Sequence, residues 1–225
     1  MTLRPFSQIL AMAEGHRDPA KIEAELRASR SRSPAEIAAT PDSEVLALMA
    51  RRIFYAGFSQ KVVDDKWPAF ETAFHHFAPA HCAFLNDEEL DALARDEAIV
   101  RNLAKIAAVQ ANARFVLDLA TRHDSAARCF AEWPGEKYVE LLDLLKKKGS
   151  HLGGVSGMRF LRMLGKPSFV LTPDVVKALI REGVVEKEPS SRKDMQAVQE
   201  AMNHWTAQSG RDLTQISRIL AWSVG

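Results

Sequence analysis

The sequence KKKGSHLGGVSGMRFLRMLGK, at Lys146–Lys166, carries the clearest structural information in the chain. Three lysines before Gly149 are typical of the last turn of a helix, because cations interact favourably with that end of the helix dipole and glycine ends a helix. The glycines at 153, 154 and 157 require a tight turn. An amphipathic run, Met158–Leu164, then follows. The stretch therefore predicts two helices joined by a glycine-rich hairpin.

Only positive charge occurs in this region, since no acidic residue lies between Leu144 and Thr172. Glycines let the backbone approach a ligand closely, and amide groups at a turn and at a helix N-terminus bind phosphate without reading bases. The hairpin is therefore a candidate contact for the DNA backbone, and the alternative is a helix end with a solvated run of lysines. The residues that we expect to contact DNA are Lys146, Lys147, Lys148, Gly153, Gly154, Ser156, Gly157 and Arg159.

Helical patterns extend from the hairpin in both directions. Apolar residues of Ile99–Thr121 recur at helical intervals over the longest run, which predicts a central core helix. Thr172-Pro173-Asp174 is typical of a helix start, because threonine caps a helix and proline suits its first position. Further helices are expected in residues 1–32 (two short ones), 40–56, 61–76 (with a start or kink near Pro68), 86–93, 134–148, 190–205 and 212–224.

Composition supports an all-α fold. Glycine (11) and proline (10) are sparse among 225 residues, and helix-forming residues dominate long stretches, which argues against a sandwich or barrel. With 47% hydrophobic and 26% charged residues, the chain as a whole is expected to build a packed core. We expect an N-terminal helical extension at residues 1–40 and a helical domain at residues 41–225, with the hairpin at 146–166.

Charge and cysteine usage restrict the cellular setting. A formal net charge of +1 argues neither for nor against nucleic acid, so only local patches are informative. Cys82 and Cys129 are far apart and lack metal-binding spacing, which favours buried thiols in a reducing compartment. No segment approaches 18 uninterrupted apolar residues, and the N-terminus lacks a signal-peptide pattern. We therefore expect a cytoplasmic protein that does not enter a membrane.

A succession of short motifs in the middle of the chain resembles a known family. The motifs are AGFS at 56–59, KWPAF at 66–70, HHF at 75–77, DEE at 87–89, IVRNLAKI at 99–106 and NAR at 112–114. Their order and spacing resemble the DNA-3-methyladenine glycosylase I (Tag-like) family of the helix-hairpin-helix DNA glycosylase superfamily. The resemblance covers residues 50–120 well and residues 149–178 more loosely.

This resemblance implies a two-lobed, all-α, helix-hairpin-helix DNA glycosylase-like fold and a role in DNA repair. Members of the family hydrolyse the N-glycosidic bond of alkylated purines such as 3-methyladenine, after flipping the damaged nucleotide out of duplex DNA into an aromatic pocket. The implied partner is double-stranded DNA that contains alkylated bases. We expect a monomer without a cofactor, and a monofunctional enzyme because small residues and Met158 occupy the hairpin position of the lyase lysine.

Three departures from the family pattern affect the chemistry. The family's carboxylate, four residues before Ala56, falls on Arg52, and its pocket tryptophan falls on Gln60. Its zinc-binding cysteines and histidines have no equivalents, so we predict no zinc site. By resemblance, the expected base pocket comprises Arg52, Tyr55, Phe58 and Gln60, whereas Trp67 is assigned to the core.

The catalytic carboxylate is assigned to Asp174. In the wider superfamily an aspartate often heads the helix after the hairpin, and counting from Gly165 places this position on Thr172, with Asp174 two residues later. The alternative is that Asp174 only complements the dipole of its helix. Three hypotheses follow: a glycosylase for alkylated purines, an altered protein that binds damaged or distorted duplex without excising a base, and a structural protein that retains the ancestral core.

Overall fold

The structure is a computed structural model that describes residues 3–225, and these residues form helices and no strand, which confirms the all-α fold class. Its α-helices are α1 (Phe6–His16), α2 (Pro19–Ala28), α3 (Pro34–Ala38), α4 (Asp42–Tyr55), α5 (Gln60–Asp65), α6 (Trp67–Ala73), α7 (Pro79–Cys82), α8 (Asp87–Arg95), α9 (Leu103–His123), α10 (Ala126–Glu132), α11 (Tyr138–Lys148), α12 (Val155–Leu164), α13 (Pro173–Arg181), α14 (Arg192–Ser209) and α15 (Leu213–Trp222). Short 3-10 helices lie at His75–Phe77 and Gly135–Lys137. No helix within residues 3–225 is long and apolar enough to cross a membrane.

The chain packs as two compact units that are discontinuous in sequence. The first unit comprises residues 3–32, 133–141 and 165–225, and the second comprises residues 33–132 and 142–164. The sequence predicts a boundary at residue 40, between an N-terminal extension and a glycosylase-like domain. The two compact units do not test this boundary, because compact packing alone does not define a glycosylase-like domain. The boundary at residue 40 stays a prediction.

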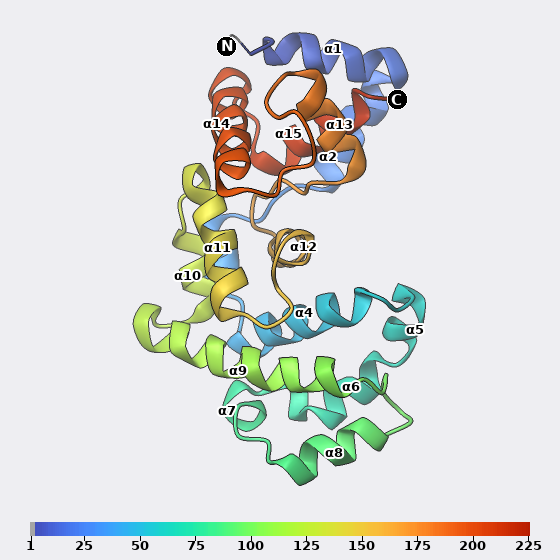
Figure 1. The fold of residues 1–225 in the computed structure, drawn as a ribbon, viewed down its shortest axis with the longest axis vertical. Helices are drawn as coiled ribbons and strands as arrows, with labels where there is room; N and C mark the ends of the chain where they lie inside the picture. Colours follow the sequence, from blue (N-terminus) through green and yellow to red (C-terminus); the bar gives the residue numbers. More distant parts are fainter. Residues whose placement is uncertain (1–2) are drawn as a thin grey trace. The chain divides into compact units, whose positions relative to one another are not determined.

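In the second unit, α9 is the central helix, as its periodicity indicated. Helices α4, α7, α8 and α10 pack against it, and α12 packs against α4 (Figure 1). The helix starts at Leu103 rather than at Ile99, because the Asn102 side chain accepts a hydrogen bond of 3.1 Å from the Lys105 amide and thereby caps it. Ile99 and Val100 are still buried, in the non-helical chain that leads into the helix.

Aromatic side chains fill the core beside α9. Trp67 is buried and stacks on Phe70 and Phe77, with ring centroids 5.4 and 5.2 Å apart, which confirms its assignment to the core. Pro68 lies in the first turn of α6, where its missing N–H costs nothing. The chain therefore breaks at Lys66, between α5 and α6, as proline at this position predicted.

Residues 149–154 form the turn of the predicted hairpin between α11 and α12. Gly154 has a φ of +56°, in the left-handed region that favours glycine. A side chain at Gly157 would collide with the carbonyl oxygen of Leu152, so this glycine lets α12 start close against the turn. Asn112 of α9 binds the backbone of the turn through two hydrogen bonds. Its Nδ2 donates to the Ser150 carbonyl at 3.0 Å, and its Oδ1 accepts from the Ser150 amide at 2.8 Å.

Replacing Asn112 by Ala should therefore loosen the hairpin. Asn112 is fully buried, and the substitution leaves both backbone groups of Ser150 without their partner. We expect the free energy of unfolding to fall by about 2–3 kcal/mol, because an unsatisfied buried polar group costs about 1–3 kcal/mol. Chemical denaturation measures this loss. Thr121→Ala on the exposed side of α9 is the control and should change stability by less than about 0.5 kcal/mol, whereas equal effects of the two variants would contradict the assignment.

In the first unit, α15 packs against α1, α13 and α14. The buried Trp205 of α14 donates from Nε1 to the Arg4 carbonyl at 3.1 Å, which attaches the N-terminal segment to this unit. Glu182 is buried but accepts hydrogen bonds from the guanidinium groups of Arg4 and Arg181, at 2.9 and 2.7 Å. Its charge is therefore neutralised within the unit.

Both cysteines are buried thiols, as expected, and they lie on different helices, α7 and α10. Burial raises the pKa of the Cys82 thiol to about 11. Because the thiolate is the reactive form, this cysteine is inert at neutral pH.

Candidate functional site

A pocket of about 400 Å³ lies in the second unit, where α4 and the start of α5 meet α12. This volume is within the range of ligand-binding pockets. Its lining residues are Arg51, Arg52, Tyr55, Gln60, Arg159, Arg162 and Met163. We call it the arginine pocket. It brings together three of the residues expected to form the base pocket, Arg52, Tyr55 and Gln60, with Arg159 from the expected DNA-contact set.

Helix geometry explains why these side chains converge. Arg52 and Tyr55 are three residues apart near the C-terminal end of α4, and Arg159 and Arg162 are three residues apart on α12. Residues at this spacing share one side of a helix. Because α12 packs against α4, the two pairs face the same pocket.

Arg52 is the most unusual residue of the pocket. It is only 7% exposed, its Nε atom is buried without a hydrogen-bond partner, and no acceptor within residues 3–225 pairs with its guanidinium. Burial lowers the pKa of Arg52 below its usual value, and repulsion from Arg159 lowers it further. Arginine nevertheless remains charged at neutral pH. By the resemblance, this buried cation, which no described residue neutralises, is predicted to stand at the family's carboxylate position.

Lys105, on α9, adds to the positive potential behind the pocket. Its Nζ donates to the carbonyl oxygens of Ile53, at 2.5 Å, and Ala56, which satisfies the C-terminal end of α4. Burial lowers the pKa of Lys105, and repulsion from Arg52 lowers it further. The Lys105 ammonium also lies 5.5 Å from the ring centroid of Phe58. Phe58 is 36% exposed and is not among the residues that line the arginine pocket, unlike the other expected base-pocket residues.

Asp64 is the carboxylate nearest to the pocket's tyrosine. The Tyr55 hydroxyl donates to Asp64 Oδ1 at 2.5 Å, and Arg51 Nε lies 3.5 Å from the same oxygen. Burial and the hydrogen bond to Asp64 raise the pKa of Tyr55. Arg51 also stacks on Trp67, with its guanidinium carbon 4.3 Å from the ring centroid. Asp64 therefore offsets the charge of Arg51, and no carboxylate is among the described residues that line the pocket.

The hairpin residues expected to contact DNA differ in exposure. Lys146, Lys147 and Lys148 are exposed in the last turn of α11, and the glycines at 153 and 154 are exposed in the turn. Ser156 is half-buried in the first turn of α12 and Gly157 is buried, so the missing side chain of Gly157 serves the packing of the turn. The contact of this set with DNA stays a prediction.

Asp174 lies in the first turn of α13, in the first unit. The Thr172 hydroxyl caps this helix by accepting a hydrogen bond of 3.3 Å from the Val175 amide, so its oxygen is engaged in the backbone. The Asp174 side chain is 50% exposed, and Lys177 Nζ lies 3.3 Å from its Oδ1. An accessible carboxylate at a helix start fits both a catalytic role and the alternative of dipole stabilisation.

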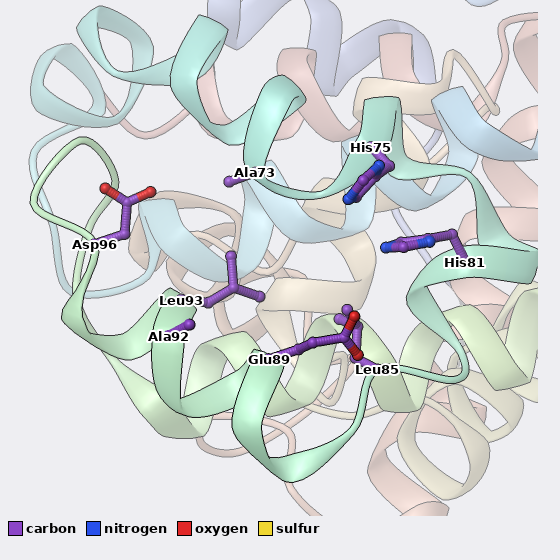
Figure 2. Close-up of a pocket in the computed structure, with 8 residues that line it drawn as sticks. All are labelled: Ala73, His75, His81, Leu85, Glu89, Ala92, Leu93 and Asp96. Carbon is purple, nitrogen blue, oxygen red and sulfur yellow. The ribbon is translucent and has the colours of Figure 1, made fainter.

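A second pocket of about 260 Å³ lies between the end of α6 and α8 in the same unit as the arginine pocket. Figure 2 shows the imidazole rings of His75 and His81 side by side, with centroids 3.7 Å apart. The Glu89 carboxylate on the opposite wall already accepts from the Asn86 amide at 2.8 Å in a capping box. Within residues 3–225 no three metal-ligating side chains come together, here or elsewhere. We therefore attribute this pocket's polar groups to local structure.

Sequence reasoning missed three lining residues, Arg51, Arg162 and Met163. The spacing of three between Arg159 and Arg162 was a usable signal, because it places both on one side of α12. Other residues of the resemblance motifs hold backbone in place rather than line the pocket. Lys105 and Asn112 do so through the bonds described above, and Arg114 Nε donates to the Ala83 carbonyl at 2.8 Å.

Comparisons with known proteins concern the fold of the chain. Residues 37–142 match the family model of methyladenine glycosylase. A structure of 3-methyladenine DNA glycosylase I from Staphylococcus aureus is 22% identical, with a TM-score of 0.50 over 55% of this chain and 76% of that one. A variant of 3-methyladenine DNA glycosylase I in complex with 3-methyladenine is 20% identical, with a TM-score of 0.52 over 68% of this chain and 89% of that one.

The 8-oxoguanine DNA glycosylase of Thermotoga maritima is 14% identical, with a TM-score of 0.52 over 95% of this chain and 94% of that one. No curated protein sequence matches the chain. The architecture is thus that of a DNA glycosylase. Within this class, the match at residues 37–142 and the structural neighbours confirm the resemblance to the Tag-like 3-methyladenine DNA glycosylase I family.

Proposed function

We propose that this protein is a monofunctional DNA repair glycosylase that releases alkylated purines from double-stranded DNA by base flipping. The observation that carries the proposal is that α12 starts at the exposed lysine- and glycine-rich hairpin and also lines a pocket of about 400 Å³. One rigid element thus connects a surface suited to phosphates with a cavity suited to a ligand. The hairpin amides and lysines would hold the strand without reading its sequence.

In this proposal, the glycosidic bond is broken through an oxocarbenium-like transition state. An alkylated purine is already a good leaving group when it carries positive charge, so the protein must mainly extrude the base and stabilise the sugar. Asp174 supplies the carboxylate that stabilises the sugar's developing positive charge and orients the attacking water. Its accessibility supports this role, as does the engagement of the neighbouring Thr172 hydroxyl in capping α13.

A base-release assay tests the proposal. The protein is incubated with duplexes that carry 3-methyladenine, 7-methylguanine or hypoxanthine, and the free base is measured by chromatography. Release of an alkylated purine above the rate of spontaneous loss is the expected result. Release from none of the duplexes, by a folded protein that still binds them, would reject excision in favour of the second candidate function.

The second candidate is recognition of damaged or distorted DNA without excision, and the charge of the arginine pocket favours it. Arg52 occupies the position of the family's carboxylate and is buried beside Arg159. Two cations repel the positive charge of 3-methyladenine in its nucleoside, whereas a carboxylate attracts it. Tight, salt-dependent binding to a duplex with an abasic site, without base release, is the expected signature.

Replacing Arg52 by Glu should increase the excision of 3-methyladenine relative to neutral hypoxanthine. The substitution converts repulsion of a cationic base into attraction, and we expect at least about a tenfold change in the ratio of the two rates, which corresponds to about 1.4 kcal/mol. Arg52→Gln removes the repulsion alone and should give an intermediate ratio. An unchanged ratio in both variants would mean that the alkylated base does not enter the arginine pocket.

A further inference from the structure

We infer that the arginine pocket is an oxyanion site that binds a phosphate group. The inference goes beyond both proposed functions, because neither assigns an anion to this pocket, and a phosphate and a flipped base would compete for it. It rests on the guanidinium groups contributed by α4 and α12 and on the burial of one of them.

Positive charge converges on the arginine pocket. Four of the seven lining residues are arginines, and none of the seven is acidic. Arg159 lowers the pKa of Arg52 by repulsion, and Arg52 does the same to Lys105, so these groups are close enough to destabilise one another. Such an arrangement is unfavourable in the absence of an anion, and it becomes favourable when an anion binds.

One guanidinium group of the pocket is buried, and its Nε has no hydrogen-bond partner. Exposed arginines are usually solvated and need no ligand, but Arg52 is 93% buried and lines the pocket. Buried charges are nearly always paired, because removing a charge from water without compensation is costly. Within residues 3–225, no carboxylate lies within 4.0 Å of its guanidinium nitrogens, since Asp64 is the partner of Arg51. An anion bound in the pocket would supply the counter-charge that the described residues do not supply.

The guanidinium groups of the lining suit an oxyanion such as phosphate. A guanidinium presents its donors as a planar fork that matches two oxygens of a phosphate, and arginine is the preferred residue for such bidentate recognition. Arg52 and Arg159 come from different helices and repel each other, so a tetrahedral oxyanion between them relieves the repulsion and can bond to both. Gln60 adds an amide group to the lining, whereas the Tyr55 hydroxyl already donates to Asp64.

Two sources share this chemistry: a phosphate of a DNA strand and a free phosphate. Isothermal titration calorimetry with inorganic phosphate against chloride at matched ionic strength tests the site directly, on the protein without DNA. We expect wild-type protein to bind phosphate, and Arg52→Gln and Arg159→Gln each to weaken binding at least tenfold. Arg122→Gln is the matched control, because Arg122 pairs with Asp118 on the surface of α9 and does not line the pocket. It should bind phosphate like wild type.

Absence of phosphate binding by wild-type protein, or equal binding by wild type and both pocket variants, would overturn the inference. The Arg159 variant keeps the test decisive if Arg52→Gln does not fold, since Arg159 is exposed. Binding to duplexes with a 5′-phosphate, with a 5′-hydroxyl or with no accessible end is then measured, in order to distinguish a phosphate of the strand from a free phosphate. If the Arg159→Gln variant binds the duplexes more weakly than wild type, the ligand is a phosphate of the strand. If this variant binds the duplexes like wild type and only its binding of inorganic phosphate is weaker, the ligand is the free ion. A protein that binds phosphate yet releases no base retains the inference and loses only the excision proposal.

Discussion

Asp174→Asn should reduce the release of alkylated purines by roughly 10²- to 10⁴-fold, which is the range for loss of a group that stabilises charge or transfers a proton in the transition state. Asparagine preserves the size of the side chain and removes its charge. DNA affinity should stay within about twofold of wild type, because Asp174 is proposed to act on the reacting sugar and not on the backbone. Single-turnover base release and fluorescence anisotropy measure the two quantities separately.

The alternative role of Asp174 predicts a different result. If its carboxylate only complements the dipole of α13, the substitution lowers stability by about 0.3–1 kcal/mol and leaves the rate of base release unchanged. Asp87→Asn is the matched control, because Asp87 occupies the first turn of α8 and is exposed. It should show the same small stability change with full activity. A Thr172→Ala variant tests the neighbouring residue separately. This substitution removes the cap of α13 and leaves the proposed catalytic carboxylate of Asp174 in place.

Helix positions were predictable from the sequence to the extent that local chemistry determines them. The starts of α8, α13 and α15 follow from the capping side chains of Asn86, Thr172 and Asp212. The start of α9 was misplaced by four residues, because Ile99 and Val100 continue its apolar pattern although they lie outside the helix. Apolar periodicity reports burial, and here the Asn102 cap determines the boundary.

The site was predictable only in part, because a pocket is a property of tertiary packing. Resemblance indicated Arg52, Tyr55 and Gln60 on one side, and the pairing of α4 with α12 was needed to add Arg51, Arg162 and Met163. By the resemblance, Arg52 is predicted to stand where the family has a carboxylate. Its burial without a partner, which carries the phosphate inference, depends on neighbours that are distant in sequence.

Replacing the three lysines of the hairpin by glutamine should weaken DNA binding by roughly 10²- to 10³-fold at 0.1 M salt. Each phosphate contact that is lost removes about 0.9 from the slope of log affinity against log salt, so three contacts account for a slope change of about 2.7. Glutamine removes the charge without adding the unfavourable carboxylates that glutamate would place at the end of α11. Titrations at several salt concentrations measure both affinity and slope.

A control with the same charge separates local contact from bulk electrostatics. Replacing Lys21, Lys187 and Lys193 by glutamine also changes the net charge from +1 to −2, since each variant loses three positive charges, and these lysines are exposed in the first unit. If the hairpin holds the strand, only the variant at Lys146–Lys148 loses affinity and slope. Equal losses in the two variants would mean that the lysines act through net charge alone. An unchanged affinity in the hairpin variant would leave the lysine run as a solvated helix end, which is the alternative that its sequence allows.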